Sequence, residues 1–104
     1  MRIISFSKKW DKLQQLGFTT FRFPRKDRDW FEGETAQVFY KSRSPQREKL
    51  GIAEIIAKEP RAVGSITILE AVADGFNNDF EMWLFLWKPD MNTEINKLTL
   101  RWVK

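Results

Sequence analysis

The sequence predicts an α+β fold in which one sheet of about five strands forms a small barrel and two to three helices pack around it. Five stretches have the composition or the alternation of strands, and three others begin with helix-capping residues. These helices are too few for a doubly wound parallel fold. With 104 residues, 42% of them hydrophobic, the chain is expected to be a single domain over residues 1–104.

The first elements are a short apolar strand and a helix. Arg2–Phe6 forms the strand, and Ser7 is a typical N-cap for a helix that Gly17 ends. The apolar residues at helical spacing are Trp10, Leu13 and Leu16. The lysines of this helix are expected on its outer face, exposed to solvent in preference to a phosphate contact: Lys8, Lys9 and Lys12.

The second strand carries the first candidate site residue. Phe21 and Phe23 share one face of this strand, and Thr20 and Arg22 share the other. Pro24 cannot donate a hydrogen bond to a sheet, so the strand is expected to end there or to lie at an edge. An arginine on the polar face of a strand is a candidate anion or nucleotide contact.

A charged, aromatic loop leads to the third strand, Thr35–Lys41. Its charged residues are Arg25, Lys26, Asp27, Arg28 and Asp29. Trp30 and Phe31 follow them, and Gly33 turns the chain. Cations mixed with aromatic rings are typical of surfaces that grip single-stranded nucleic acid. Trp30 is expected either to stack on a base or to lie in the core, and the sequence leaves both open.

A polar link, residues 42–47, joins the third strand to a fourth at Lys49–Lys58, which predicts a long hairpin. Arg43 and Arg47 make its tip basic, so both are candidate contacts for a nucleic-acid backbone. The alternative is a solvent-exposed turn that has no binding role. Pro60 is expected to end the fourth strand.

Two helices and a strand complete the chain. Thr67–Glu70 has the spacing of a capping box, which starts a short helix that Gly75 ends. Asn78–Glu81 repeats the signal for a helix that Pro89 closes, and its nearly all-apolar side chains predict that it is substantially buried. Lys97–Val103 alternates between apolar and polar residues and is predicted to be a terminal strand.

The composition excludes several kinds of chemistry. The chain has no Cys and no His, which removes disulfides and cysteine- or histidine-based catalysis, and no cofactor or metal is expected. A net charge of +4 and a pI of about 9.6 favour anionic ligands. No signal peptide is visible and no apolar stretch approaches ~20 residues, so a cytoplasmic protein that does not enter membranes is expected.

Several local strings, in order, resemble one known family over nearly the whole chain. The strings are Thr19–Pro24, Gly33–Glu34, Leu50–Ile55 and Glu70–Phe76, followed by the closing strand Asn96–Trp102. Together they resemble the ASCH domain family of the PUA-like superfamily.

The resemblance implies a PUA-like β-barrel with a charged cleft beside the first helix. Members of the family are proposed to bind RNA, and a few small members hydrolyse the amide of an acylated cytidine nucleoside. Carried over to the matching positions, the resemblance puts Arg22 and Asp74 in the cleft, with Thr20 nearby. The alternative, which is compatible with a site, is a salt bridge between Arg22 and Asp74 that braces a helix against the barrel.

The first functional hypothesis is a module that binds RNA or a nucleotide-like ligand in a cleft formed by Thr20, Arg22 and Asp74. An arginine fork suits a phosphate or a base edge, and a carboxylate opposite it accepts from an exocyclic amine. The residues expected to extend the nucleic-acid contact are Arg25, Lys26, Arg28, Trp30, Arg43 and Arg47.

Two other hypotheses stay open. The enzymatic relatives use a lysine, a threonine and a glutamate, whose first two positions align here with Thr19 and Arg22, so an amidohydrolase is the less favoured reading. In this reading, Thr20 and a displaced lysine such as Lys26 would have to replace the catalytic threonine and lysine of the enzymatic relatives. The third hypothesis is a protein-interaction module built on exposed aromatic side chains.

Overall fold

The computed structural model describes the chain except for residues 7–9, 25–26, 87–88 and 104. Its strands are β1 (Arg2–Phe6), β2 (Gly17–Arg22), β3 (Thr35–Tyr40), β4 (Glu48–Ala62) and β5 (Glu94–Trp102). Its helices are α1 (Ile68–Asp74) and α2 (Asp79–Phe85), with short 3-10 segments at Asp11–Gln14 (η1) and Val63–Ser65 (η2). The predicted α+β class with a five-stranded sheet is therefore confirmed.

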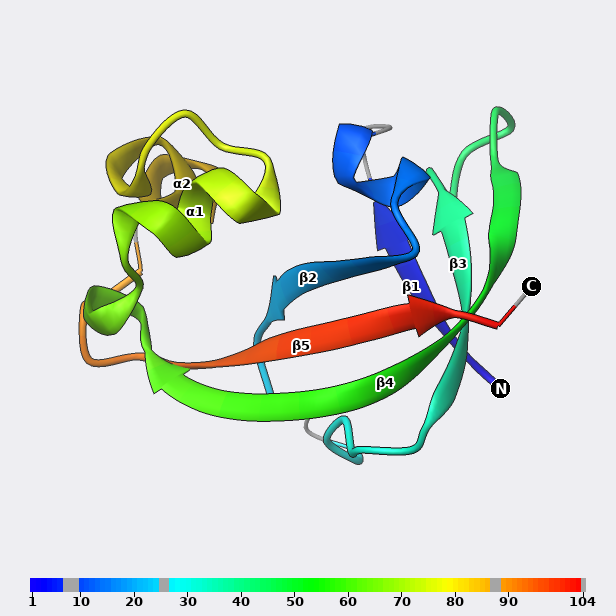
Figure 1. The fold of residues 1–104 in the computed structure, drawn as a ribbon, viewed down its shortest axis with the longest axis horizontal. Coiled ribbons are helices and arrows are strands. Elements are labelled where there is room, and N and C mark those ends of the chain that lie inside the picture. Colours follow the sequence, from blue (N-terminus) through cyan, green and yellow to red (C-terminus); the bar gives the residue numbers. More distant parts are fainter. Residues whose placement is uncertain (7–9, 25–26, 87–88, 104) are drawn as a thin grey trace.

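The five strands form one mixed sheet in the order β1-β3-β4-β5-β2. β1 runs parallel to β3, and the other neighbours are antiparallel. The long β4 curves strongly (Figure 1), and irregularities in its pairing at Val38/Phe39 and Ile55/Ala57 help it to bend. Among the described residues no ladder joins β1 to β2, so the predicted barrel is not closed by backbone hydrogen bonds.

Both helices lie at one end of the sheet, beyond the end of β4 and away from the two termini (Figure 1). The α1 capping box forms as predicted: Thr67 accepts from the Glu70 amide, and the Glu70 carboxylate accepts from the Thr67 amide. Asn78 caps α2 by accepting from the Glu81 amide. These caps connect residues only three positions apart, which is why the sequence reveals them.

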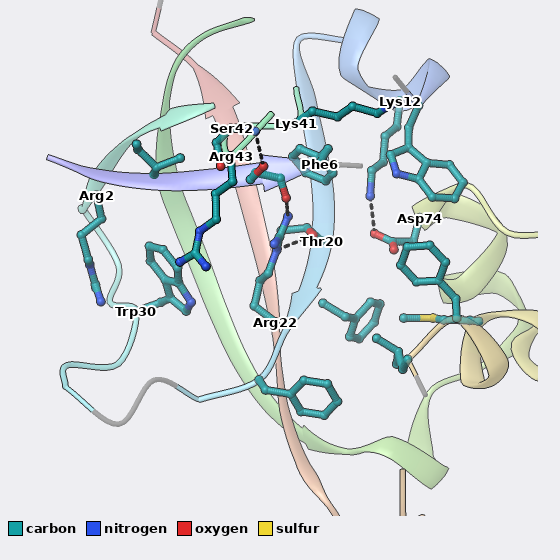
Figure 2. A pocket seen from close by; sticks show the side chains of 18 of the residues that line it. Arg2, Phe6, Lys12, Thr20, Arg22, Trp30, Lys41, Ser42, Arg43 and Asp74 are labelled. Carbon is teal, nitrogen blue, oxygen red and sulfur yellow. Dashed lines mark hydrogen bonds and ion pairs between the residues drawn. The ribbon is translucent and has the colours of Figure 1, made fainter. Parts of the chain in front are cut away.

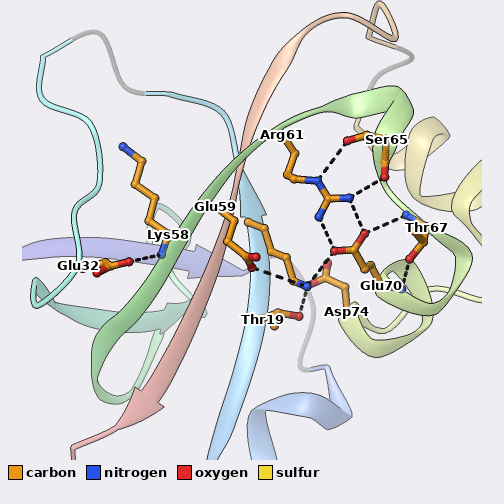
Figure 3. Close-up of polar contacts among 10 residues, drawn as sticks. Thr19, Glu32, Lys58, Glu59, Arg61, Ser65, Thr67, Glu70 and Asp74 are labelled. Atoms are coloured by element: carbon orange, nitrogen blue, oxygen red, sulfur yellow. Dashed lines mark hydrogen bonds and ion pairs between the residues drawn. The ribbon is translucent and has the colours of Figure 1, made fainter.

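Glu70 also fastens α1 to the sheet (Figure 3). Its carboxylate accepts two hydrogen bonds from Arg61 of β4, at 2.7 and 2.9 Å, and one from Lys97 of β5 at 2.9 Å. Arg61 in turn donates to the Ser65 carbonyl at 2.7 Å. These contacts, led by the Arg61 hydrogen bonds, hold the pKa of Glu70 well below its usual range.

Three expectations about the elements are wrong. The first helix is only the 3-10 segment η1; Trp10 precedes it without a side-chain cap, and the proposed cap Ser7 lies outside the described residues. Of the residues expected on its apolar face, Trp10 and Leu13 pack on the core, whereas Leu16 is 90% exposed. β4 continues through Pro60 to Ala62, because β3 pairs with β4 only as far as Glu54 and leaves one edge of β4 open there.

After the first helix and the end of β4, the third wrong expectation is that α2 is substantially buried. Met82 is its one buried residue, whereas Phe80, Leu84 and Phe85 are 61%, 41% and 50% exposed. The helix is apolar on several faces, but at the end of the sheet only one of them is covered. It ends at Phe85, and the residues just before the predicted stop at Pro89 are among those not described.

The core lies inside the curve of the sheet. The predicted alternation of β5 is confirmed, since Leu98 and Leu100 are fully buried while Arg101 is exposed. Trp10 and Trp30 are buried as well. Within the described part of the chain, no helix has the length and apolar character needed to cross a membrane.

Candidate functional site

A pocket of about 1180 Å³ opens where the unpaired edges of β1 and β2 approach each other (Figure 2). Its walls come from these two strands, from η1, from the β3–β4 hairpin, and from α1 and α2. Five of its described lining residues are cationic and one is anionic: Arg2, Lys12, Arg22, Lys41, Arg43 and Asp74. The pocket thus has a clear positive excess.

Arg22 and Asp74, the two residues expected to face each other, both line this pocket. They do not form an ion pair. Asp74 accepts instead from Lys12, whose Nζ lies 2.7 Å from Asp74 Oδ1. The predicted Arg22–Asp74 salt bridge is therefore wrong as a contact, although the two groups share the cavity.

Lys12 is the site residue that sequence reasoning missed. It was expected on a solvated helix face, but it is 6% exposed and also donates to the Thr19 carbonyl at 2.7 Å. Its ammonium lies over the rings of Phe6 and Trp10, at 5.3 and 5.8 Å. No local pattern reveals this, because Asp74 is 62 positions away in sequence.

Burial dominates the electrostatics of the Lys12–Asp74 pair. It lowers the pKa of Lys12 and raises the pKa of Asp74, while the attraction between the two charges acts against both shifts. Both contacts of Asp74 use Oδ1, the second being the Thr19 hydroxyl at 3.4 Å. Oδ2 accepts no hydrogen bond from the residues that the structure describes.

The turn after α1 fixes the position of Asp74. Gly75 adopts a left-handed conformation with φ of 114°, as predicted for a helix C-cap. A Cβ at Gly75 would lie 2.6 Å from Cε3 of Trp10, so the indole packs directly on the glycine. Trp10 packs in turn against Phe76 and Phe85, with ring centroids 5.0 and 5.9 Å apart. These rings form an aromatic wall of the pocket.

Arg22 crosses the gap between the two strand edges (Figure 2). Its Nη2 donates to the Ser5 carbonyl of β1 at 2.9 Å, and its Nε donates to Thr20 Oγ1 at 3.2 Å. Its guanidinium carbon lies 4.8 Å from the centre of the Phe6 ring. Burial lowers the pKa of Arg22 to about 10, although the negative charge of Asp74 acts in the opposite direction. Arg22 therefore stays charged near neutral pH.

The loop before β3 is held against the sheet, and Trp30 is part of the core. Trp30 is 4% exposed, with the Arg2 guanidinium 4.2 Å from its ring centre, and it still lines the pocket. Asp29 fixes this loop by accepting from Lys58 at 2.7 Å and from Asn96 at 2.8 Å. Of the two expectations for Trp30, the core position is therefore confirmed. A nucleobase could contact Trp30 only from within the pocket.

The other predicted contact residues are divided. Arg28 is exposed, outside the pocket, with its guanidinium carbon 5.6 Å from the ring centre of the 47% exposed Phe31. Arg43 lines the pocket, whereas Arg47 is exposed on the same hairpin and does not. The remaining two, Arg25 and Lys26, lie outside the described residues.

We compared the chain with known protein families, curated proteins and solved structures. No family model, no curated protein and no solved structure matches the chain. Among the described residues, no group of three or more acidic side chains is placed to hold a metal ion.

Proposed function

We propose that this protein binds RNA or a nucleotide-like ligand in the pocket between β1 and β2. The observation that carries the proposal is the make-up of the pocket: a positive lining with one carboxylate, aromatic walls, and a volume of about 1180 Å³. Thr20, Arg22 and Asp74 all contribute to it, as the family resemblance implies. We further propose that the curled sheet is a PUA-like barrel whose seam Arg22 bridges, and that the chain is an ASCH-type domain.

The two charged groups suit different parts of a nucleotide. The Oδ2 atom of Asp74, to which no described residue donates, suits an exocyclic amine of a base, and Lys12 lies beside the carboxylate as a donor. Arg22 supplies a planar guanidinium for an oxyanion or a base edge. Since Arg22 and Asp74 share the pocket without forming an ion pair, one ligand could contact both groups.

The direct test is a binding titration of short RNAs, nucleosides and nucleotides with the wild type and Arg22→Ala, at low and moderate salt. Wild type should bind, Arg22→Ala should bind at least tenfold more weakly, as loss of a charge-assisted contact costs about that much, and binding of RNA should weaken as salt rises. Lys49→Ala, which removes an exposed cation of β4 outside the pocket, is the matched control and should change RNA affinity little. If wild type binds none of these ligands, the proposal is wrong.

A second candidate, hydrolysis of an acylated cytidine, is favoured by one observation: the pocket does contain a lysine beside its acid. Lys12, from η1, takes the place of the lysine that the alignment lacked, and Thr20 also lines the pocket. Once deprotonated, Lys12 would take a proton from a water that attacks the amide carbonyl and would give that proton to the departing nitrogen as the C–N bond breaks, which releases cytidine and the carboxylic acid.

This activity is checked by following release of cytidine from an acylated cytidine. Wild type should release it, with a rate that rises with pH as Lys12 loses its proton, and Lys12→Arg should not. Absence of release by wild type removes the enzyme hypothesis without affecting the binding proposal.

The third hypothesis, a protein-interaction module, is supported by the apolar side chains exposed on α1 and α2, such as Leu69 (82%) and Phe80 (61%). Salt separates this function from the first. Association through these side chains should respond little to salt, whereas phosphate binding should weaken steeply.

A further inference from the structure

The cations of the pocket differ in whether a carboxylate already neutralises them. Arg2 donates to both carboxylate oxygens of Glu34, and Lys12 is paired with Asp74. Arg22 and Arg43 have no carboxylate partner among the described residues. Two of the three guanidinium groups in the pocket therefore have no described carboxylate in direct contact, although the charge of Asp74 acts on Arg22 from beyond ion-pair distance.

Arg22 is the more telling of the two, because it is fixed and largely withdrawn from water. A guanidinium carries five N–H donors. The described residues accept from two of these, through the neutral oxygens of Thr20 and Ser5. A largely buried cation that no carboxylate contacts is costly, and charges in such surroundings cluster at functional sites.

Arg43 brings a second guanidinium to the same side of the pocket. It lies on the turn after β3, which is tied to β1 by the hydrogen bond from the Ser42 amide to Ser5 Oγ at 3.1 Å. Figure 2 shows its side chain extending from this turn into the pocket, toward Trp30 and Arg22. Ser5 thus anchors both arginines, Arg22 through its carbonyl and the turn that carries Arg43 through its hydroxyl.

We infer that Arg22 and Arg43 form a phosphate subsite, so that the preferred ligand is a phosphorylated nucleotide, such as a nucleoside monophosphate or a terminal nucleotide, and not the bare nucleoside. Two forks with unused donors, facing one cavity from a strand and from a hairpin, suit the oxygens of a phosphate monoester. Lys12 and Asp74 line the same pocket and are left for the base. This inference rests on the proposed function, and it adds which chemical group the pocket selects.

The test compares each ribonucleoside with its 5′-monophosphate by isothermal titration calorimetry at low salt. The monophosphate should bind at least about tenfold more tightly than the nucleoside, since each charge-assisted hydrogen bond gained is worth roughly that factor. This phosphate gain should shrink as salt rises. Inorganic phosphate should compete with the monophosphate.

Three variants locate the subsite. Arg22→Lys keeps the charge but removes the fork, and should lose most of the phosphate gain while nucleoside affinity changes little. Arg43→Ala, on an exposed turn where unfolding is not expected, should also reduce the gain, and it keeps the test decisive if Arg22→Lys is unstable. Lys49→Ala, on the β4 strand of the same hairpin but outside the pocket, should leave the gain unchanged.

The outcomes separate this inference from the proposed function. Equal affinity for nucleoside and monophosphate, a phosphate gain that survives in both Arg22→Lys and Arg43→Ala, or binding of RNA without binding of monophosphates overturns the phosphate subsite alone. Failure of wild type to bind any nucleoside, nucleotide or RNA overturns both.

Discussion

The two acids of α1 are four residues apart and lie in opposite electrostatic environments. Glu70, in the first turn, is partly exposed and accepts from Arg61, Lys97 and a backbone amide. Asp74, at the last position, is buried, and among the described residues Lys12 is the one cation that forms an ion pair with it. The pKa of Glu70 is lowered mainly by the Arg61 hydrogen bonds, whereas the pKa of Asp74 is raised by burial.

The difference indicates that Glu70 stabilises the fold, and it fits the ligand-binding role that we propose for Asp74. The Glu70 carboxylate accepts hydrogen bonds from Arg61, Lys97 and a backbone amide, and these contacts join α1 to the sheet. Asp74 sits in a pocket with one oxygen that the described residues leave unused, beside a lysine whose own pKa is lowered by burial. Buried and incompletely compensated charges gather at functional sites, and this association supports the proposed binding role of Asp74 at the end of α1.

The largest effect is expected when the buried pair is broken. Lys12→Met leaves Asp74 buried without a counter-charge, which should lower the free energy of unfolding by about 3–5 kcal/mol near neutral pH. Urea denaturation measures this. The double variant Lys12→Met with Asp74→Asn removes both charges and should recover much of the loss. A loss in Lys12→Met as small as that of an ordinary surface substitution would mean that Asp74 is not buried as a charge.

The next effect concerns the turn that positions Asp74. Gly75→Ala must adopt a positive φ and also push against the Trp10 ring, and we expect a loss of about 2–4 kcal/mol in the free energy of unfolding. Gly33→Ala is the matched control, because Gly33 has φ of 90° but no atom within 4 Å of an added Cβ. Gly33→Ala should lower the free energy of unfolding only by the cost of placing alanine at a positive φ, about 1–2 kcal/mol. Equal losses in the two variants would show that Trp10 yields to the added methyl.

A smaller effect is expected at the other end of the helix. Glu70→Gln keeps an oxygen for the cap but loses the charge that Arg61 and Lys97 share, which should cost about 1–2 kcal/mol in thermal or urea unfolding. Glu59→Gln is the control, since Glu59 is exposed and lies 3.9 Å from Lys97. It should change stability by less than about 0.5 kcal/mol. If both variants behave alike, Glu70 does not fasten α1 to the sheet.

The smallest effect is in the pH dependence of the free energy of unfolding. As the pH falls, the contribution of Glu70 decreases and that of Asp74 increases. The folded pKa of Glu70 lies below its ordinary 4.5, so its contribution is present above that pH and is lost as the pH falls. The folded pKa of Asp74 lies above its ordinary 3.8, so the fold takes up a proton there and gains stability as the pH falls through that window. Glu70→Gln should therefore flatten the acid loss of stability, and Asp74→Asn should steepen it, in urea unfolding at a series of acidic pH values. Parallel profiles for the two variants would remove the distinction between the two ends of α1.

The sequence by itself determined the elements whose signals are local. The caps at Thr67 and Asn78, the stop at Gly75 and the alternation of Leu98 and Leu100 each depend on residues a few positions apart, and all are found in the structure. The α+β class with five strands follows from these elements in order. The sequence also named Arg22 and Asp74, and both line one pocket.

The tertiary structure alone decided which groups meet. Lys12 pairs with Asp74 across 62 positions, the seam between β1 and β2 stays without a ladder, Trp30 lies in the core, and α2 keeps exposed apolar side chains. The physical reason is that burial and long-range pairing depend on how the sheet curls and where its edges stop. Periodicity indicates which face of an element is apolar or charged, but it does not say what the fold places against that face.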